Sequence, residues 1–216
     1  VLMGLCMSGS LVTFYMFYEA MTLLTFPLVL HTMKKDAVAA GIKYLIYSVV
    51  GASLALLGIF VLSPYVSSFT FTAGGVLDMS KVAGHEGLVL AMAFLMLLGF
   101  GTKAGMFPLH GWLPTAHPAA PSPASAVLSG IITKAGVLGA LRLIYCFIGT
   151  AFLRGTWVQT AFMSLTLFTV FMGSQLAYQE GGLKKRLAYS SVSQVSYVLF
   201  GLSTMHPIGF IGAMLH

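Results

Sequence analysis

Three ionisable residues lie inside long apolar stretches of this sequence, where charged side chains are rare. Glu19 lies in F-Y-M-F-Y-E-A-M-T-L-L-T-F-P, Lys103 in G-F-G-T-K-A-G-M-F-P, and Lys134 in S-G-I-I-T-K-A-G-V-L-G. A charged side chain at the centre of a membrane helix costs about 2.5–3.5 kcal/mol on insertion scales. Residues kept there at that cost indicate proton or ion chemistry inside a membrane.

The types of these residues suggest how a proton could move between them. A carboxylate beside a buried ammonium favours its charged form, and moving the carboxylate away releases the proton. Glu19 and Lys103 could form such a pair, and Lys134 could receive or pass on the proton through bound water. The alternative is structural, because a lone charge can pair with a neighbouring helix and fix its register. Lys134 lies about 15 Å along its predicted helix from Ala124, which is too deep for easy snorkelling.

Weaker candidates lie nearer the predicted membrane surface. Lys43 is close to the start of its helix, where snorkelling is the simpler explanation. His110 and His117 lie in P-L-H-G-W-L-P-T-A-H-P, and histidine titrates near neutrality, which suits proton uptake but equally suits an interfacial position.

No zinc, phosphate-loop or dinucleotide motif occurs, so we expect no metal and no cofactor. Ser129 and Gly130 resemble an intramembrane serine protease only faintly, since lysine is the wrong partner for such a serine.

The composition excludes a soluble protein. Hydrophobic residues make up 58% of the chain and charged residues only 7%, whereas the surface of a soluble domain is about 25–35% charged. Cys6 and Cys146 are too few for a disulfide scaffold, and the high hydrophobicity excludes disorder. The net charge of +6 comes from scattered bases without a stripe, so we expect a lipid bilayer and no nucleic acid as the partner.

Apolar runs of membrane-spanning length organise the chain as an all-α, polytopic helix bundle. A spanning helix needs about 20 apolar residues, and nothing alternates with the period of a barrel strand. A long polar loop containing Asp78, Lys81, His85 and Glu86 separates the second and third runs. The chain opens on Val1 and ends within a new apolar run, so we expect a fragment of a larger membrane protein. The six predicted spans are Leu5–Leu30, Ala37–Leu62, Leu88–Trp112, Ala124–Ile148, Trp157–Ala177 and Leu187–Ser203, and a seventh begins at Pro207.

Glycine and proline cluster around Lys103 and predict a break in the third span. Gly99, Gly101, Gly105 and Pro108 surround the lysine, and irregular backbone at membrane depth is tolerated only where it is buried or lines a wet cavity. Discontinuous helices of this kind mark ion sites in transporters, although glycines also allow close helix packing. The lysine at the break favours the ion site.

The loops predict the orientation of the spans. Five bases fall in one set of alternate loops and two in the other. Because positive residues favour the cytoplasmic side, the richer set is expected there, together with the segment Met106–Ser122. The richer set is Lys34, Lys35, Lys184, Lys185 and Arg186, and the other set is Lys81 and Arg154.

Three stretches resemble a known family. They are G-T-K-A-G-M-F-P-L-H-G-W-L-P-T-A-H-P-A-A-P-S-P-A-S-A from Gly101, S-G-I-I-T-K-A-G from Ser129 and L-K-K-R-L-A-Y-S-S-V-S-Q from Leu183. They are similar to the proton-conducting antiporter-like subunits of respiratory complex I, Mrp-type sodium/proton antiporters and membrane-bound hydrogenases. The resemblance implies two inverted five-helix repeats. Residues 1–216 would then form a single membrane domain fragment, with the first repeat nearly whole and the second truncated.

The resemblance also implies roles for individual residues. Glu19 matches the family's glutamate of the fifth helix, Lys103 the lysine at the break in the seventh and Lys134 the lysine of the eighth. Lys43 matches a lysine of the sixth helix more weakly. The chain is then expected to be a proton-translocating, non-redox subunit in a bacterial or archaeal cytoplasmic membrane. It would work with other membrane subunits of a complex I-like or hydrogenase-like assembly. The alternatives are an Mrp-type subunit that also moves sodium ions and a purely structural membrane subunit.

Overall fold

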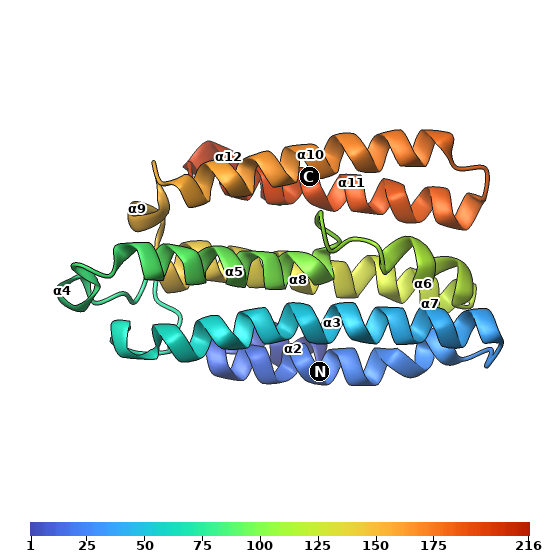
Figure 1. Cartoon of the computed structure of the whole chain (residues 1–216), viewed down its shortest axis with the longest axis horizontal. Coiled ribbons are helices and arrows are strands. Elements are labelled where there is room, and N and C mark those ends of the chain that lie inside the picture. The colour runs from blue at the N-terminus through green and yellow to red at the C-terminus, as the bar shows by residue number, and fades with distance from the viewer.

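The computed structural model describes residues 1–216 and is built from helices packed with their long axes nearly parallel (Figure 1). The all-α prediction is confirmed. α5 and α8 form a middle layer between the α2–α3 pair and the α10–α11 pair. In chain order the helices are α1 (Leu2–Met7), α2 (Leu11–Leu30), α3 (Lys35–Leu62), α4 (Met79–Val82), α5 (Glu86–Ala104), α6 (Leu113–Ala119), α7 (Ser122–Val127), α8 (Thr133–Arg142), α9 (Thr150–Leu153), α10 (Trp157–Gln179), α11 (Leu183–Ser203) and α12 (Pro207–Leu215).

Five helical stretches are long and apolar enough to cross a membrane. The second, fourth and fifth predicted spans agree with them within a few residues. The sixth predicted span is α11, which has a similar length but carries serines along it and bases in its first turn. It therefore falls outside the set of most apolar helices. The five stretches are Leu11–Leu30, Lys35–Tyr65, Glu86–Ala104, Ser122–Ile148 and Trp157–Gln179.

The first predicted span was expected to be one continuous helix, and this was wrong, because the structure divides it into α1 and α2. α1 ends at Met7, and α2 begins after Ser10, whose side-chain oxygen accepts a hydrogen bond from the backbone N–H of Thr13. Serine is a favoured N-cap because it satisfies an N–H that the helix leaves free. The Arg142 guanidinium donates hydrogen bonds to the backbone oxygens of Cys6 and Ser8, so it binds the end of α1 from across the bundle.

The third predicted span ran through a break to Trp112, and in the structure α5 stops at Ala104 and the next helix begins at Leu113. Gly105 has a left-handed backbone with φ +84, and its N–H bonds back to the carbonyls of Gly101 and Thr102. Glycine adopts this conformation without the steric cost that other residues meet. Figure 1 shows α5 ending near the middle of the bundle and α6 lying farther along. The predicted break is therefore present.

The fourth span is a continuous helix that changes its winding twice. Leu128–Ile132 and Leu143–Ile148 have π-helical hydrogen bonding on either side of α8. Such wide turns are rare in α-helices and often occur at functional sites. The first of them ends two residues before Lys134, whose Nζ donates to the carbonyl of Ser129 within it.

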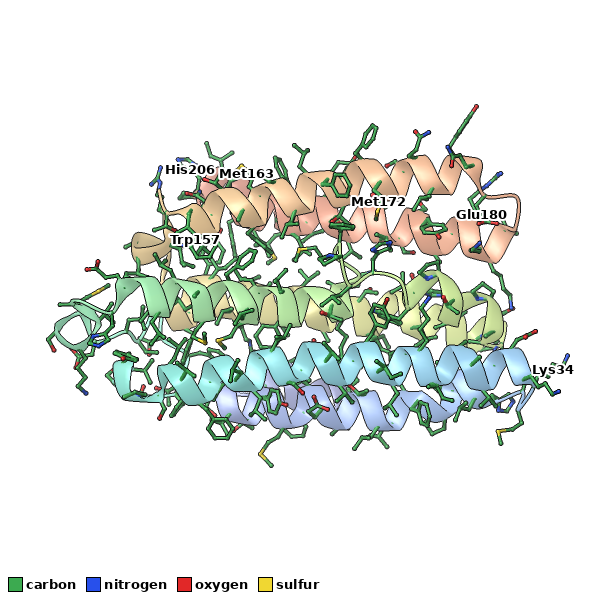
Figure 2. All side chains as sticks on the ribbon, viewed as in Figure 1. Lys34, Trp157, Met163, Met172, Glu180 and His206 are labelled. Atoms are coloured by element: carbon green, nitrogen blue, oxygen red, sulfur yellow. The ribbon has the colours of Figure 1, made fainter.

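The predicted basic loops lie at one end of the bundle. Lys34 and Glu180 are at the same end, and Trp157 and His206 lie near the other (Figure 2). Lys185 Nζ pairs with Glu180 Oε2 at 2.6 Å, and this hydrogen bond lowers the pKa of the Glu180 carboxyl. The arrangement agrees with the alternation predicted from the loops, and the positive-inside rule predicts that this end is cytoplasmic.

Close backbone contact joins α5 to α8, and a glycine makes it possible. A Cβ built on Gly136 would lie 2.5 Å from the backbone nitrogen of Ala104 and 2.6 Å from the carbonyl oxygen of Phe100. Backbone atoms at an interface cannot move aside as a flexible side chain would. Small residues at such positions let membrane helices approach closely.

Replacing Gly136 with alanine is expected to destabilise the fold by about 3 kcal/mol, the upper range of overpacking costs. The measurement is the thermal or denaturant midpoint of the detergent-solubilised complete protein. Gly87→Ala in α5 is the control, because nothing lies within 4 Å of its new Cβ. Equal midpoints for the two variants would contradict the packing argument.

Candidate functional site

Lys103 is the most deeply buried charged side chain of the chain, at 1% exposure. It lies in the last turn of α5, beside the break, and crosses to α2. Its Nζ donates hydrogen bonds to the backbone oxygen of Tyr18 at 2.6 Å and to Thr22 Oγ1 at 2.8 Å. The same Nζ lies 3.5 Å from the centroid of the Tyr18 ring, in cation–π geometry. A buried charge therefore has three neutral partners on one helix.

Glu19 lies on the same helix, directly after Tyr18, and is partly buried. Tyr15 donates a long hydrogen bond of 3.5 Å to Glu19 Oε1. The ion pairs within 4.0 Å are Lys81–Asp78 and Lys185–Glu180, which lie outside the spans. The structure thus brings Lys103 to the helix of Glu19 but not into contact with its carboxylate.

The backbone around the break is held by polar contacts. Trp112 is fully buried, and its indole N–H donates to the carbonyl of Thr102 at 2.8 Å. The N–H of Phe107 donates to Thr169 Oγ1 in α10 at 3.1 Å. The first bond adds a partner to a carbonyl in the last turn of α5, and the second gives a partner to an N–H within the break, as irregular backbone at membrane depth requires.

Lys134 leaves α8 on a different side from the Lys103 site. Its Nζ donates to the Ser129 carbonyl at 2.9 Å, and no hydrogen bond joins it to Lys103. Its side chain is exposed in this chain and lines two cavities, both of which include Gln194 of α11. The structure therefore does not bring Glu19, Lys103 and Lys134 into one contact cluster.

The more polar of these cavities has a volume of about 570 Å³ and runs between α7, α8 and α11. It is large enough for several water molecules and presents hydroxyl groups for them to bond. Lys184, in the first turn of α11, also lines it and donates to the Ala120 carbonyl. No carboxylate lines this cavity. Its polar lining residues are His117, Ser122, Ser125, Ser129, Lys134, Lys184, Ser190, Ser191 and Gln194.

The two histidines and Lys43 occupy the region of α6. His117 is 3% exposed, and its Nδ1 lies 2.6 Å from Ser125 Oγ. Burial lowers the pKa of His117 to about 4, so this ring is neutral at pH 7. The Nδ1 atom of His110 is buried without a hydrogen-bond partner. Lys43 Nζ donates to Thr115 Oγ1 at 3.1 Å, so it contacts the segment after the break.

Two residues were missed in the sequence: Thr22, which accepts a hydrogen bond from Lys103, and Arg142, which contacts the end of α1. Thr22 could have been found by its spacing, because it lies three residues after Glu19 and threonine is a hydrogen-bond partner at membrane depth. Arg142 was overlooked within an apolar run, although it contacts the end of α1 and lies 5.4 Å from the Phe14 ring centroid. That partner was not predicted, because the end of α1 was not recognised in the sequence.

Comparison with known proteins places this arrangement in a family. Residues 8–216 match the family described as NADH:quinone oxidoreductase/Mrp antiporter, TM. The chain is 33% identical over 214 residues to hydrogenase-4 component B of Escherichia coli (strain K12), covering 94% of this chain and 31% of that protein. It is 32% identical to NADH-quinone oxidoreductase subunit N of Desulforudis audaxviator (strain MP104C), covering 100% of this chain and 42% of that protein.

A solved structure shares the fold. The chain aligns with the structure of the Mrp complex from Dietzia sp. DQ12-45-1b at a TM-score of 0.83 and 24% identity, over 99% of this chain and 39% of that one. The chain thus spans less than half the length of these relatives. Its apolar helices and its relatives make it an integral membrane protein. The match over nearly its whole length shows that the chain belongs to the NADH:quinone oxidoreductase/Mrp antiporter transmembrane family.

Proposed function

We propose that this chain is part of a proton-translocating subunit in a complex I-like NADH:quinone oxidoreductase or a membrane-bound hydrogenase, with Glu19, Lys103 and Lys134 as the groups that carry the proton. The observation that carries the proposal is Lys103 itself, fully buried at a helix break and held by neutral partners only. A structural lysine would be expected to have a carboxylate partner, because an unpaired buried charge is costly.

The polar cavity supports a route for protons to Lys134. It begins beside Lys184, in the basic first turn of α11, and reaches Lys134 past a row of serine hydroxyls. Water bonded to hydroxyls can pass protons along such a cavity, and His117 with Ser125 could orient that water at its wall. Protons would move from the cavity to Lys134 and then between Lys134 and the Lys103–Glu19 region through further bound water.

Replacing Lys134 with methionine in the complete subunit is expected to slow proton translocation about 100-fold or more, since a positioned proton-transfer group contributes a factor of about 100–10,000. The measurement is acidification inside vesicles that contain the assembled complex, driven by its electron donor. Lys81→Met is the control, because Lys81 is exposed and pairs with Asp78 outside the spans. Normal pumping by the Lys134 variant would remove this residue from the proposed route.

The alternative function is that of an Mrp-type sodium/proton antiporter subunit, which the family description and the fold likeness to the Mrp complex favour equally. Sodium dependence separates the two. The proposed function predicts that donor-driven acidification continues at the same rate in sodium-free buffer. Proton movement that requires sodium and no electron donor would instead assign the chain to an antiporter.

The relatives are more than twice as long as this chain, which bears on how much of the proton route it contains. We propose that residues 1–216 form one membrane unit that contains most of the first inverted repeat, and that further helices complete the proton route. Other membrane subunits are the expected partners, because NADH-quinone oxidoreductase subunit N and the Mrp complex are named as parts of larger assemblies. Electron transfer would take place in such partners.

A further inference from the structure

We infer that Tyr18 and Thr22 form a seat that holds the Lys103 ammonium away from Glu19, and that translocation moves this ammonium between the seat and the carboxylate. The inference rests on the proposed function and adds a positioning residue, Thr22, to it. It explains why Lys103 lies against the helix of Glu19 without a salt bridge.

The geometry of α2 builds the seat. Side chains of a helix lean toward its N-terminus, so the residue at position i+4 covers the carbonyl of residue i. Thr22 is four residues after Tyr18, and both the Tyr18 carbonyl and Thr22 Oγ1 lie within 2.8 Å of Lys103 Nζ. The carbonyl oxygen has a second lone pair, so it can accept from the lysine while remaining in the helix.

The Tyr18 ring completes the seat and is itself held in place. Lys103 Nζ lies 3.5 Å from its centroid, which uses the negative face of the ring. Phe100 packs against Tyr18 edge to face, with centroids 5.3 Å apart, and the Tyr18 hydroxyl donates to the Gly99 carbonyl at 3.4 Å. The three N–H groups of the ammonium therefore have three partners, all without charge.

Glu19 is the competing site. It lies three residues before Thr22 and so shares the face of α2 that Lys103 contacts. Rotations of the flexible four-carbon stem of Lys103 can therefore bring the ammonium toward it while α2 stays fixed. A relay must break the Lys103–Glu19 pair in order to release a proton from the lysine. The seat lowers the cost of breaking the pair, because the freed ammonium exchanges a carboxylate for a carbonyl, a hydroxyl and a ring face.

Thr22→Val in the complete subunit tests this inference, because it removes the hydroxyl and keeps the shape. Removing one partner of a charged group is expected to slow donor-driven proton translocation about tenfold or more, with normal assembly. Thr22→Ser restores a hydroxyl and is expected to restore most of the rate. Thr166→Val in α10 is the matched control, since Thr166 is buried and bonds only the Met163 carbonyl of its own helix.

Measuring Lys103→Ala together with the Thr22 variants distinguishes failure of the seat from failure of the proposed function. A wild-type rate for Thr22→Val, with Lys103→Ala inactive, would overturn the seat and leave the proposed function standing. Equal slowing by Thr22→Val and Thr22→Ser would also overturn it, because a merely structural role does not depend on the hydroxyl. A wild-type rate for Lys103→Ala would overturn both. If Thr22→Val assembles poorly, the same comparison uses Thr22→Ala against Thr22→Ser.

Discussion

Exchanging the two charges, Glu19→Lys together with Lys103→Glu, is expected to leave proton translocation about 100-fold or more below the wild-type rate, as in each single variant. The reason is the chemistry of the Lys103 seat. The Tyr18 carbonyl and the face of its ring attract a cation and repel a carboxylate, so a glutamate at position 103 loses two of the three partners that the lysine has. When the exchanged pair separates, the glutamate at position 103 therefore lacks partners that would stabilise its charge.

The measurement for this double variant is the rate of donor-driven acidification in vesicles, with both single variants prepared in parallel. Assembly is followed by co-purification of the partner subunits. A double variant that pumps clearly faster than either single variant would contradict the account, because it would show that mutual pairing alone is enough.

The sequence was most informative where a charge met an apolar run. Lys103 was predicted to lie at a break at membrane depth, and the structure has the break two residues later, at Gly105. The predicted span was extended past the break to Trp112 because those residues are almost as apolar as a helix interior. Hydropathy measures burial in lipid or protein, and it does not separate a buried loop from a buried helix.

The first span shows the same limitation. Ser8, Gly9 and Ser10 are residues that commonly punctuate helices and cap them, but apolar residues on both sides hid the signal. The structure divides the segment there, and Arg142 binds the end of α1. Partners separated by more than 130 positions in the chain depend on the packing of the whole bundle, which periodicity does not predict.

The direction of a side chain around its helix was not predictable from the sequence. Lys134 was expected to exchange a proton with the Glu19–Lys103 pair, and its position about 15 Å along its helix did not indicate the side on which it leaves. The direction of a side chain depends on every residue before it, and the π-helical segment Leu128–Ile132 changes the winding just before Lys134. The structure directs Lys103 to α2, and Lys134 to cavities shared with α11.

Lys103→Ala is expected to abolish proton translocation through this subunit while the complex still assembles. The side chain supplies the ammonium, and the groups left behind can be satisfied without it. The Tyr18 carbonyl remains an ordinary acceptor within its helix, and the Thr22 hydroxyl can bond water or backbone. The variant leaves space that water can occupy at a polar site, so the cost to the fold is expected to be small beside the loss of function.

The most direct test of the claim that Lys103 carries the proton is the number of protons moved per donor molecule oxidised, measured in vesicles with wild-type and Lys103→Ala complexes. Lys81→Ala serves as the control for loss of a lysine outside the spans. The account predicts wild-type stoichiometry for the control. For Lys103→Ala it predicts that the share of protons due to this subunit is lost from an otherwise assembled complex. Wild-type stoichiometry in the Lys103 variant would contradict it.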